Sequence, residues 1–157
     1  MKKLILSFGH AFCGIVFCVK TCRNFRIHLT AAVYMLYFSR FYDYGAAEDC
    51  ILFVLIALVL CAEGMNCALE QTCNAVTLND NSFIKHAKDA AAGAVLICAF
   101  SAAAIGLRLY FRISVFSEIY LYFVSSPLKI LLLLLSAAVS VLFIFYKDIF
   151  KNGTKTN

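Results

Sequence analysis

The decisive stretch of this sequence is Cys61-Ala-Glu-Gly-Met-Asn-Cys-Ala-Leu-Glu-Gln-Thr-Cys-Asn74, which continues the apolar run Ile51–Ala62. An ionisable side chain next to hydrocarbon is costly and usually functional, so Glu63 and Glu70 are candidate site residues. On a helix, four polar side chains of this stretch fall within an arc of roughly 80°: Glu63, Asn66, Glu70 and Asn74. Lipid offers this polar stripe no partner, so we expect it to face protein, water or a bound ion.

The composition places the chain in a membrane. Of 157 residues, 63% are hydrophobic and only 15% are charged. A soluble domain of this length could not bury so much apolar surface. The sequence therefore predicts an all-α, integral membrane helical bundle.

Hydrophobic patterning divides the chain into segments. Residues 2–26 predict an amphipathic surface helix, with a short membrane span as the alternative. Three spans are expected after it, at His28–Tyr44, about Glu48–Asn74 and about Phe83–Arg112. The polar loop Thr77–Ser82 favours a turn and a helix start. After Ser125-Ser126-Pro127, the apolar segment Leu128–Tyr146 is long enough for an extra C-terminal span.

The net charge of +5 suggests contact with anionic lipid headgroups rather than nucleic acid. Basic residues gather before the first span, in the loop after the second, and at the carboxyl end: Lys2, Lys3, Lys20, Arg23, Arg26, Lys85, Lys88, Lys147, Lys151 and Lys155. This bias predicts a multi-pass protein of the cytoplasmic membrane, with those three regions on the cytoplasmic side.

The chain has eight cysteines and no CxxC pair. Most lie in apolar runs, where cysteine packs as a small hydrophobe, so we expect core cysteines in a reduced protein. The alternative is a thiolate metal site of Cys61, Cys67 and Cys73, although their spacing matches no known ligand pattern.

Carboxylates near lysines and arginines suggest a site for a divalent metal and a phosphate. Mg²⁺ takes oxygen ligands, usually one or two carboxylates plus phosphate oxygens, and a second carboxylate can act as a general base. Phosphoryl transfer needs mainly these parts. Glycine-rich nucleotide motifs are absent from the sequence. The alternative is that the polar stripe makes only interhelical hydrogen bonds, in a structural or channel-like bundle.

Three blocks resemble the small prokaryotic diacylglycerol and undecaprenol kinases. They are Phe8-Gly-His-Ala-Phe-Cys-Gly14 with Arg23-Asn-Phe-Arg-Ile-His28, then Glu63-Gly-Met-Asn-Cys-Ala-Leu-Glu70, and Ala87-Lys-Asp-Ala-Ala-Ala-Gly-Ala-Val-Leu96. The second is similar to the family signature E-x-x-N-[TS]-A-[IL]-E. The match covers about residues 3–112.

This resemblance implies a homotrimer that transfers phosphate from MgATP to a membrane lipid alcohol at the cytoplasmic face. Glu63 would be the catalytic base, and Glu70 would bind Mg²⁺. The nucleotide and substrate contacts implied are Asn66, Lys88, Asp89, His10 and Lys3; a histidine here more often has a structural role. The motif Arg23-Asn-Phe-Arg-Ile-His28 is closer to that of the family branch that phosphorylates undecaprenol. On this ground we favour undecaprenol over diacylglycerol as the acceptor.

Two features depart from the family pattern. Cys22 stands where the family carries a metal-binding glutamate, and a neutral thiol is a poor Mg²⁺ ligand. Asn74 similarly replaces an aspartate. The alternative function is therefore a catalytically impaired protein of the same fold, and a weaker third is an ion or small-molecule transporter. The second departure is a region outside the resemblance, so we expect a kinase domain at residues 1–112 and an additional hydrophobic helix with a basic tail at 113–157.

Overall fold

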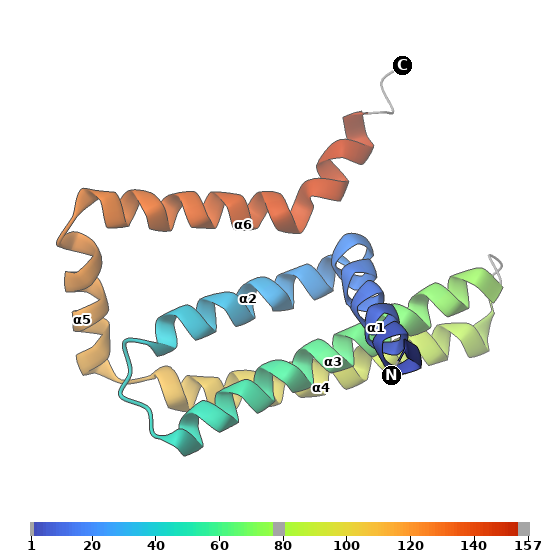
Figure 1. Ribbon diagram of the computed structural model, residues 1–157, viewed down its shortest axis with the longest axis horizontal. Helices are drawn as coiled ribbons and strands as arrows, with labels where there is room; N and C mark the ends of the chain where they lie inside the picture. Colours follow the sequence, from blue (N-terminus) through green and yellow to red (C-terminus); the bar gives the residue numbers. More distant parts are fainter. Residues whose placement is uncertain (1, 77–80, 154–157) are drawn as a thin grey trace.

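The computed structural model describes residues 2–76 and 81–153, and side chains for residues 3–76 and 81–146. In these ranges the chain is all-α, which confirms the predicted fold class. Six helices follow one another (Figure 1): α1 (Lys2–Thr21), α2 (Arg23–Ser39), α3 (Ala46–Val76), α4 (Ser82–Tyr110), α5 (Ile113–Val124) and α6 (Pro127–Gly153).

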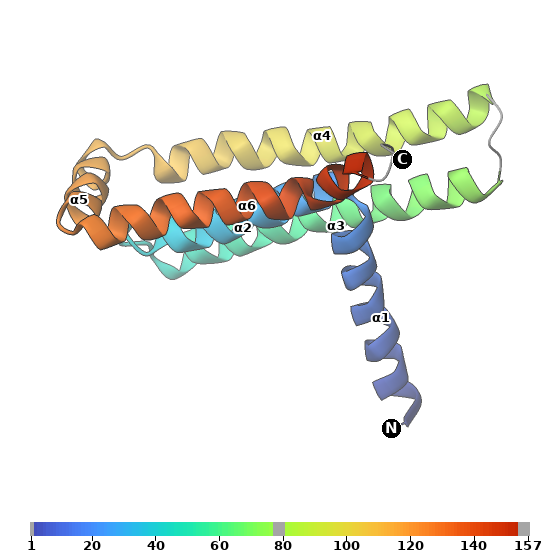
Figure 2. The same cartoon turned by 90° about the horizontal axis from the view of Figure 1, so that it is seen from above.

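Four helices form an elongated bundle and one leaves it. Helices α2, α3, α4 and α6 run alongside one another, whereas α1 projects crosswise from the bundle (Figure 2). Helix α5 connects α4 to α6 at one end of the bundle.

Four of the helices are long and apolar enough to cross a membrane: α1, α3, α4 and the part of α6 from Pro127 to Tyr146. Three of them coincide with predicted spans. The fourth predicted span corresponds to α2, which at 17 residues lies at the short limit of membrane-spanning helices.

The segment predicted as one amphipathic helix, residues 2–26, is two helices. Helix α1 ends at Thr21, and Cys22 has an extended backbone with φ −104° and ψ 113°. Arg23 and Arg26 therefore belong to α2, although they were expected on the surface helix. The single extended residue turns the chain from the direction of α1 into that of α2 (Figure 2).

Helix α4 starts as the Asx-rich loop predicts. The Asn81 side-chain oxygen accepts a hydrogen bond from the Phe83 backbone N–H at 2.9 Å, which caps the helix. Residues 77–80 of the predicted loop lie outside the described residues. Helix α6 begins with Pro127, whose fixed φ and missing N–H suit the first turn of a helix.

Tyrosines hold together the end of the bundle where α2 turns into α3. Tyr42 donates to the Tyr110 carbonyl at 2.8 Å, Tyr44 to the Leu109 carbonyl at 3.1 Å, and Tyr110 to the Met35 carbonyl at 2.6 Å. A tyrosine suits this role because it combines an apolar ring, which packs between helices, with a hydroxyl that can donate to a backbone carbonyl.

Helix α6 packs along α2. The Tyr34 hydroxyl lies 3.1 Å from the Ser136 hydroxyl and 3.2 Å from that of Ser140. At the other end, Tyr146 donates to the Lys20 carbonyl at 3.1 Å. The α1–α2 junction lies toward the same end of the bundle as the end of α3, the start of α4 and the carboxyl end of α6 (Figure 1). This agrees with the grouping that the distribution of basic residues predicts.

Candidate functional site

The polar stripe lies on the second half of α3. Its two central side chains are almost completely buried, with Glu63 2% and Asn66 4% exposed. Glu70 is half-buried and Asn74 is exposed, so the stripe runs from the interior of the protein to its surface. This change in burial follows from the seven-residue spacing of Glu63 and Glu70. Seven residues are about two helical turns, so the two side chains lie on the same face of α3 and about 10 Å apart along its axis.

Two oxygens of this stripe lack partners. Among the described residues, neither Glu63 Oε2 nor Asn66 Oδ1 has a hydrogen-bond partner, although both atoms are buried. The Asn66 amide nitrogen lies 3.4 Å from Glu70 Oε1, which draws the second carboxylate toward the first. Buried oxygen acceptors without donors are costly in isolation, and a cation or a donated proton would satisfy them.

The donor set fits Mg²⁺ rather than a metal caged by protein alone. Carboxylate and amide oxygens are its preferred protein ligands, and it usually keeps ligand positions for phosphate and water. In the described ranges, no three His, Cys, Asp or Glu side chains group as a metal site, so the thiolate site considered for Cys61, Cys67 and Cys73 finds no support.

Lys88 connects the neighbouring helix to the stripe. Its ammonium group donates to Asn74 Oδ1 at 2.7 Å, across the α3–α4 turn. A cation thus stands at the surface end of the acidic stripe, where it could neutralise a phosphate. Asp89 is exposed on the same helix, and within the described residues its side chain makes no hydrogen bond or ion pair.

The structure does not bring Lys3 and His10 to the stripe. Both side chains are exposed on α1, whose amino end lies away from the bundle (Figure 2). No hydrogen bond or ion pair joins either side chain to α3 in the described part of the chain. Their predicted contact with nucleotide or substrate remains a prediction.

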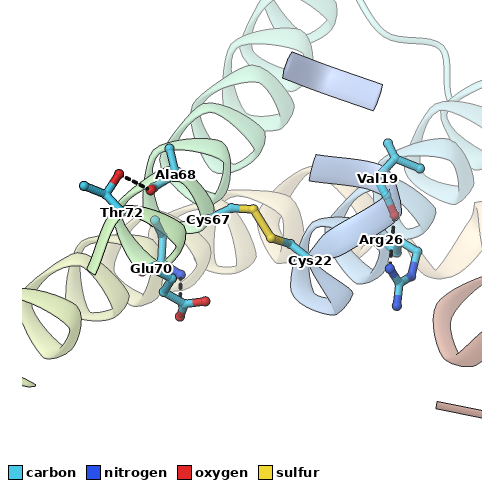
Figure 3. Close-up of a disulfide and its surroundings, with 8 residues drawn as sticks. Val19, Cys22, Arg26, Cys67, Ala68, Glu70 and Thr72 are labelled. Atoms are coloured by element: carbon cyan, nitrogen blue, oxygen red, sulfur yellow. Dashed lines mark hydrogen bonds between the residues drawn. A yellow bond between two sulfur atoms is a disulfide. The ribbon is translucent and has the colours of Figure 1, made fainter. Parts of the chain in front are cut away.

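Cys22 is bonded to Cys67 of α3 in a disulfide, which Figure 3 shows beside Glu70. The Cα atoms are 6.2 Å apart, and 45 residues separate the two cysteines in sequence. A disulfide sulfur has no thiolate to offer a metal. The expectation of core cysteines in a reduced protein is therefore wrong for this pair, because apolar surroundings do not reveal a bonding partner 45 residues away.

The α1–α2 junction packs on α3 beside the buried part of the stripe. Phe25 and Cys22 pack with Cys67 in one buried cluster. The Phe25 ring lies against Gly64, where an added Cβ would meet it at 3.8 Å. These contacts were not predicted, because the helical spacing of α3 does not reveal which segment lies on it.

These features define a multi-pass helical membrane protein with a buried acidic site near one end of its bundle. The family model for prokaryotic diacylglycerol kinase matches the chain over residues 9–110. The chain belongs to this family of membrane lipid kinases, and the resemblance seen in the sequence is confirmed.

Two characterised relatives are similar over most of the matched region. Undecaprenol kinase of Bacillus subtilis (strain 168) is 36% identical over 110 residues, which are 70% of this chain and 89% of that relative. Diacylglycerol kinase of Synechocystis sp. (strain ATCC 27184 / PCC 6803 / Kazusa) is 35% identical over 104 residues, 66% of this chain and 59% of the relative. No solved structure matches the chain significantly. Helices α5 and α6 lie beyond the family match.

Proposed function

We propose that this protein transfers the terminal phosphate of ATP to the hydroxyl of a membrane lipid alcohol, with Glu63 as the catalytic base. The observation that carries the assignment is the buried Glu63 Oε2, which lacks a hydrogen-bond donor among the described residues. An alcohol hydroxyl is a donor that would satisfy this oxygen, and the carboxylate would take its proton as the oxygen attacks phosphorus.

The remaining residues bind and orient. Glu70 and the free Asn66 oxygen would hold the Mg²⁺ that accompanies ATP, since they supply the hard oxygen ligands that this ion prefers. When bound, Mg²⁺ neutralises phosphate charge. Lys88 would contact the phosphates from α4, with Asp89, His10 and Lys3 as further nucleotide or substrate contacts.

An apolar groove supports a lipid as the acceptor. The groove has a volume of about 250 Å³ and lies between α2, α3 and α4. Val59 and Leu60, which line it, precede Glu63 by one turn of α3. A hydrocarbon chain in this groove would leave its hydroxyl end near the carboxylate, because apolar pockets with few polar groups at one end orient their ligands.

Undecaprenol is the acceptor we favour over diacylglycerol. The relative named undecaprenol kinase matches this chain over 89% of its own length, whereas the one named diacylglycerol kinase matches over 59%. The motif Arg23-Asn-Phe-Arg-Ile-His28 supports the same choice.

We place the site at the cytoplasmic face, with α1 along the membrane surface. The basic residues of the α1–α2 junction and of the α3–α4 region support this orientation. The crosswise direction of α1 relative to the bundle supports a surface position (Figure 2). The resemblance of the kinase motifs supports a homotrimer.

The test is a side-by-side assay in lipid nanodiscs that contain undecaprenol or diacylglycerol. We expect labelled phosphate from ATP to appear in lipid, faster with undecaprenol. Labelling of neither alcohol would contradict the proposed reaction, and faster labelling of diacylglycerol would contradict the acceptor.

One observation favours a second candidate, a catalytically impaired member of the family. The disulfide leaves Cys22 without a group that can bind Mg²⁺. If the protein is impaired, Cys22→Glu should raise lipid phosphorylation strongly from a negligible level under reducing conditions, where the Cys22–Cys67 bond is broken in the unaltered chain as well. Full activity of the unaltered chain would exclude it.

A further inference from the structure

The disulfide joins the turn between two helices to the helix that carries the site. Cys22 is the extended residue between α1 and α2, and Cys67 follows Glu63 by four residues on α3. Residues four apart share one face of a helix, so the bond attaches the junction to the same face as the proposed base. Cys67 is 1% exposed and Cys22 is 9% exposed.

The junction packs on α3 beside the proposed base. Phe25 packs over Gly64, and Cys22, Phe25 and Cys67 form one buried cluster against Leu60. Glu63, one residue before Gly64 and one turn before Cys67, is 2% exposed and has an oxygen without a hydrogen-bond partner among the described residues. Because that oxygen is buried, a lipid hydroxyl held at the end of the groove needs the side chains packed around Glu63 to move before it can bond to the oxygen, and a covalent bond between the junction and α3 opposes such movement.

Few other interactions hold α1 itself. Hydrogen bonds from Arg26 of α2 and Tyr146 of α6 reach α1 at the carbonyls of Val19 and Lys20, in its last turn. Most of α1 is exposed, and it projects from the bundle (Figure 2). Without the disulfide, the junction would be held by these non-covalent bonds and by packing, which can open locally while the rest of the bundle stays folded.

We infer that the Cys22–Cys67 pair is a redox-responsive tie that holds the kinase site closed when oxidised and lets it open when reduced. This inference rests on the proposed function and on the cytoplasmic position of the site. Disulfides of proteins in the reducing cytosol are usually transient, and serve catalysis or redox sensing.

The exchange needs an external dithiol, such as a reduced dithiol protein. One thiolate of the dithiol bonds to the Cys22 sulfur, which is the more exposed, and releases Cys67 as a thiolate that takes a proton. The second thiolate then displaces Cys22, which is protonated in turn. Two cysteine thiols form while the dithiol becomes a disulfide, and an oxidised disulfide donor reverses the reaction.

The test uses the full chain in nanodiscs, with either redox state prepared by dithiothreitol or by oxidised glutathione. Thiol alkylation and peptide mass mapping report the fraction with Cys22 linked to Cys67. We expect reduction to accelerate lipid phosphorylation by roughly five- to a hundredfold, the ordinary range of coupling between two sites. Cys67→Ser should show the faster rate and no response to dithiothreitol. Cys61→Ser removes a free, exposed cysteine of the same helix and should keep the full response.

Equal rates in the two redox states, a faster oxidised form, or no linked peptide after oxidation would overturn the inference. If neither redox state phosphorylates a lipid alcohol, the proposed function fails. The role of the Cys22–Cys67 pair can then be tested independently, by comparing the amide hydrogen exchange of residues 18–26 in the two redox states. Faster exchange after reduction in the unaltered chain, absent in Cys67→Ser, would support it. Unchanged exchange would overturn it.

Discussion

Arg26 on α2 donates two hydrogen bonds to one oxygen of α6, the carbonyl of Ile144, from Nε at 3.0 Å and from Nη2 at 2.9 Å. Its Nη1 donates to the Val19 carbonyl of α1 at 3.1 Å. The guanidinium also lies 5.0 Å from the centre of the Tyr146 ring, and the residue is 1% exposed. One buried arginine therefore joins α6, which lies beyond the family match, to the two helices that meet beside the site.

Replacing this arginine should loosen α6 from the bundle. We expect Arg26→Leu to lower stability by about 2–3 kcal/mol, because hydrogen bonds from a charged group are among the stronger ones. Thermal unfolding in detergent micelles would measure the loss. Arg40→Leu, an exposed arginine at the other end of α2, is the control and should change stability little. Equal effects of the two variants would contradict the joining role of Arg26.

Glu63→Gln should abolish most of the lipid phosphorylation. The amide has nearly the shape of the carboxylate but cannot take the hydroxyl proton, and loss of a general base typically costs about 100-fold or more in rate. Turnover of ATP and lipid in nanodiscs would show it. ATP binding should persist, since Glu63 is not proposed to hold the nucleotide. An unchanged turnover would mean that another residue is the base.

Glu70→Ala should raise the Mg²⁺ concentration needed for half-maximal activity. We expect this concentration to rise at least about tenfold. Loss of a residue that only contacts a metal ligand already lowers metal affinity by about 10-fold or more, and Glu70 is proposed to be a ligand itself. The measurement is a Mg²⁺ titration of lipid phosphorylation at constant ATP, after removal of metal with a chelator. Gln71→Ala, the next residue on α3, is a matched control. Superimposable titrations of Glu70→Ala and the unaltered chain would contradict the metal role.

Lys88→Ala and Asn74→Ala together separate a structural role from a nucleotide-binding role. The two side chains share the hydrogen bond of 2.7 Å, so either substitution removes it. Only Lys88→Ala also removes the positive charge, and we expect it to raise the KM for ATP by roughly tenfold or more. Asn74→Ala should change this KM by less than about threefold, since a single neutral partner is lost. Equal changes in KM would show that Lys88 acts only through Asn74.

The helical arrangement of the polar stripe was accessible from sequence because it depends on local spacing. Glu63 and Glu70 are seven residues apart on one helix, and the structure keeps that helix continuous from Ala46 to Val76. The end of the first helix was less accessible. No glycine or proline marks the break at Cys22, so the hydrophobic pattern of residues 2–26 predicted a single helix.

The short helix α5 was also missed as a separate element. Its residues, Ile113–Val124, form an apolar run of only 12 residues, shorter than a membrane span. The break at Ser125-Ser126-Pro127 located its end, whereas its start at Ile113 follows an extended Arg112 that carries no strong breaking signal.

Sequence alone determined that this protein is a helical membrane protein, that two acids share one face of a helix, and that its motifs resemble a lipid kinase. These properties depend on composition and on contacts within a few residues. Only the tertiary structure decided that Cys22 meets Cys67, 45 residues away, and that Arg26 meets Ile144, 118 residues away. Such pairs form only when helices far apart in the sequence pack together, which requires the long segment between them to form a closed loop. Helical periodicity describes contacts within a few residues and does not predict which helices pack together.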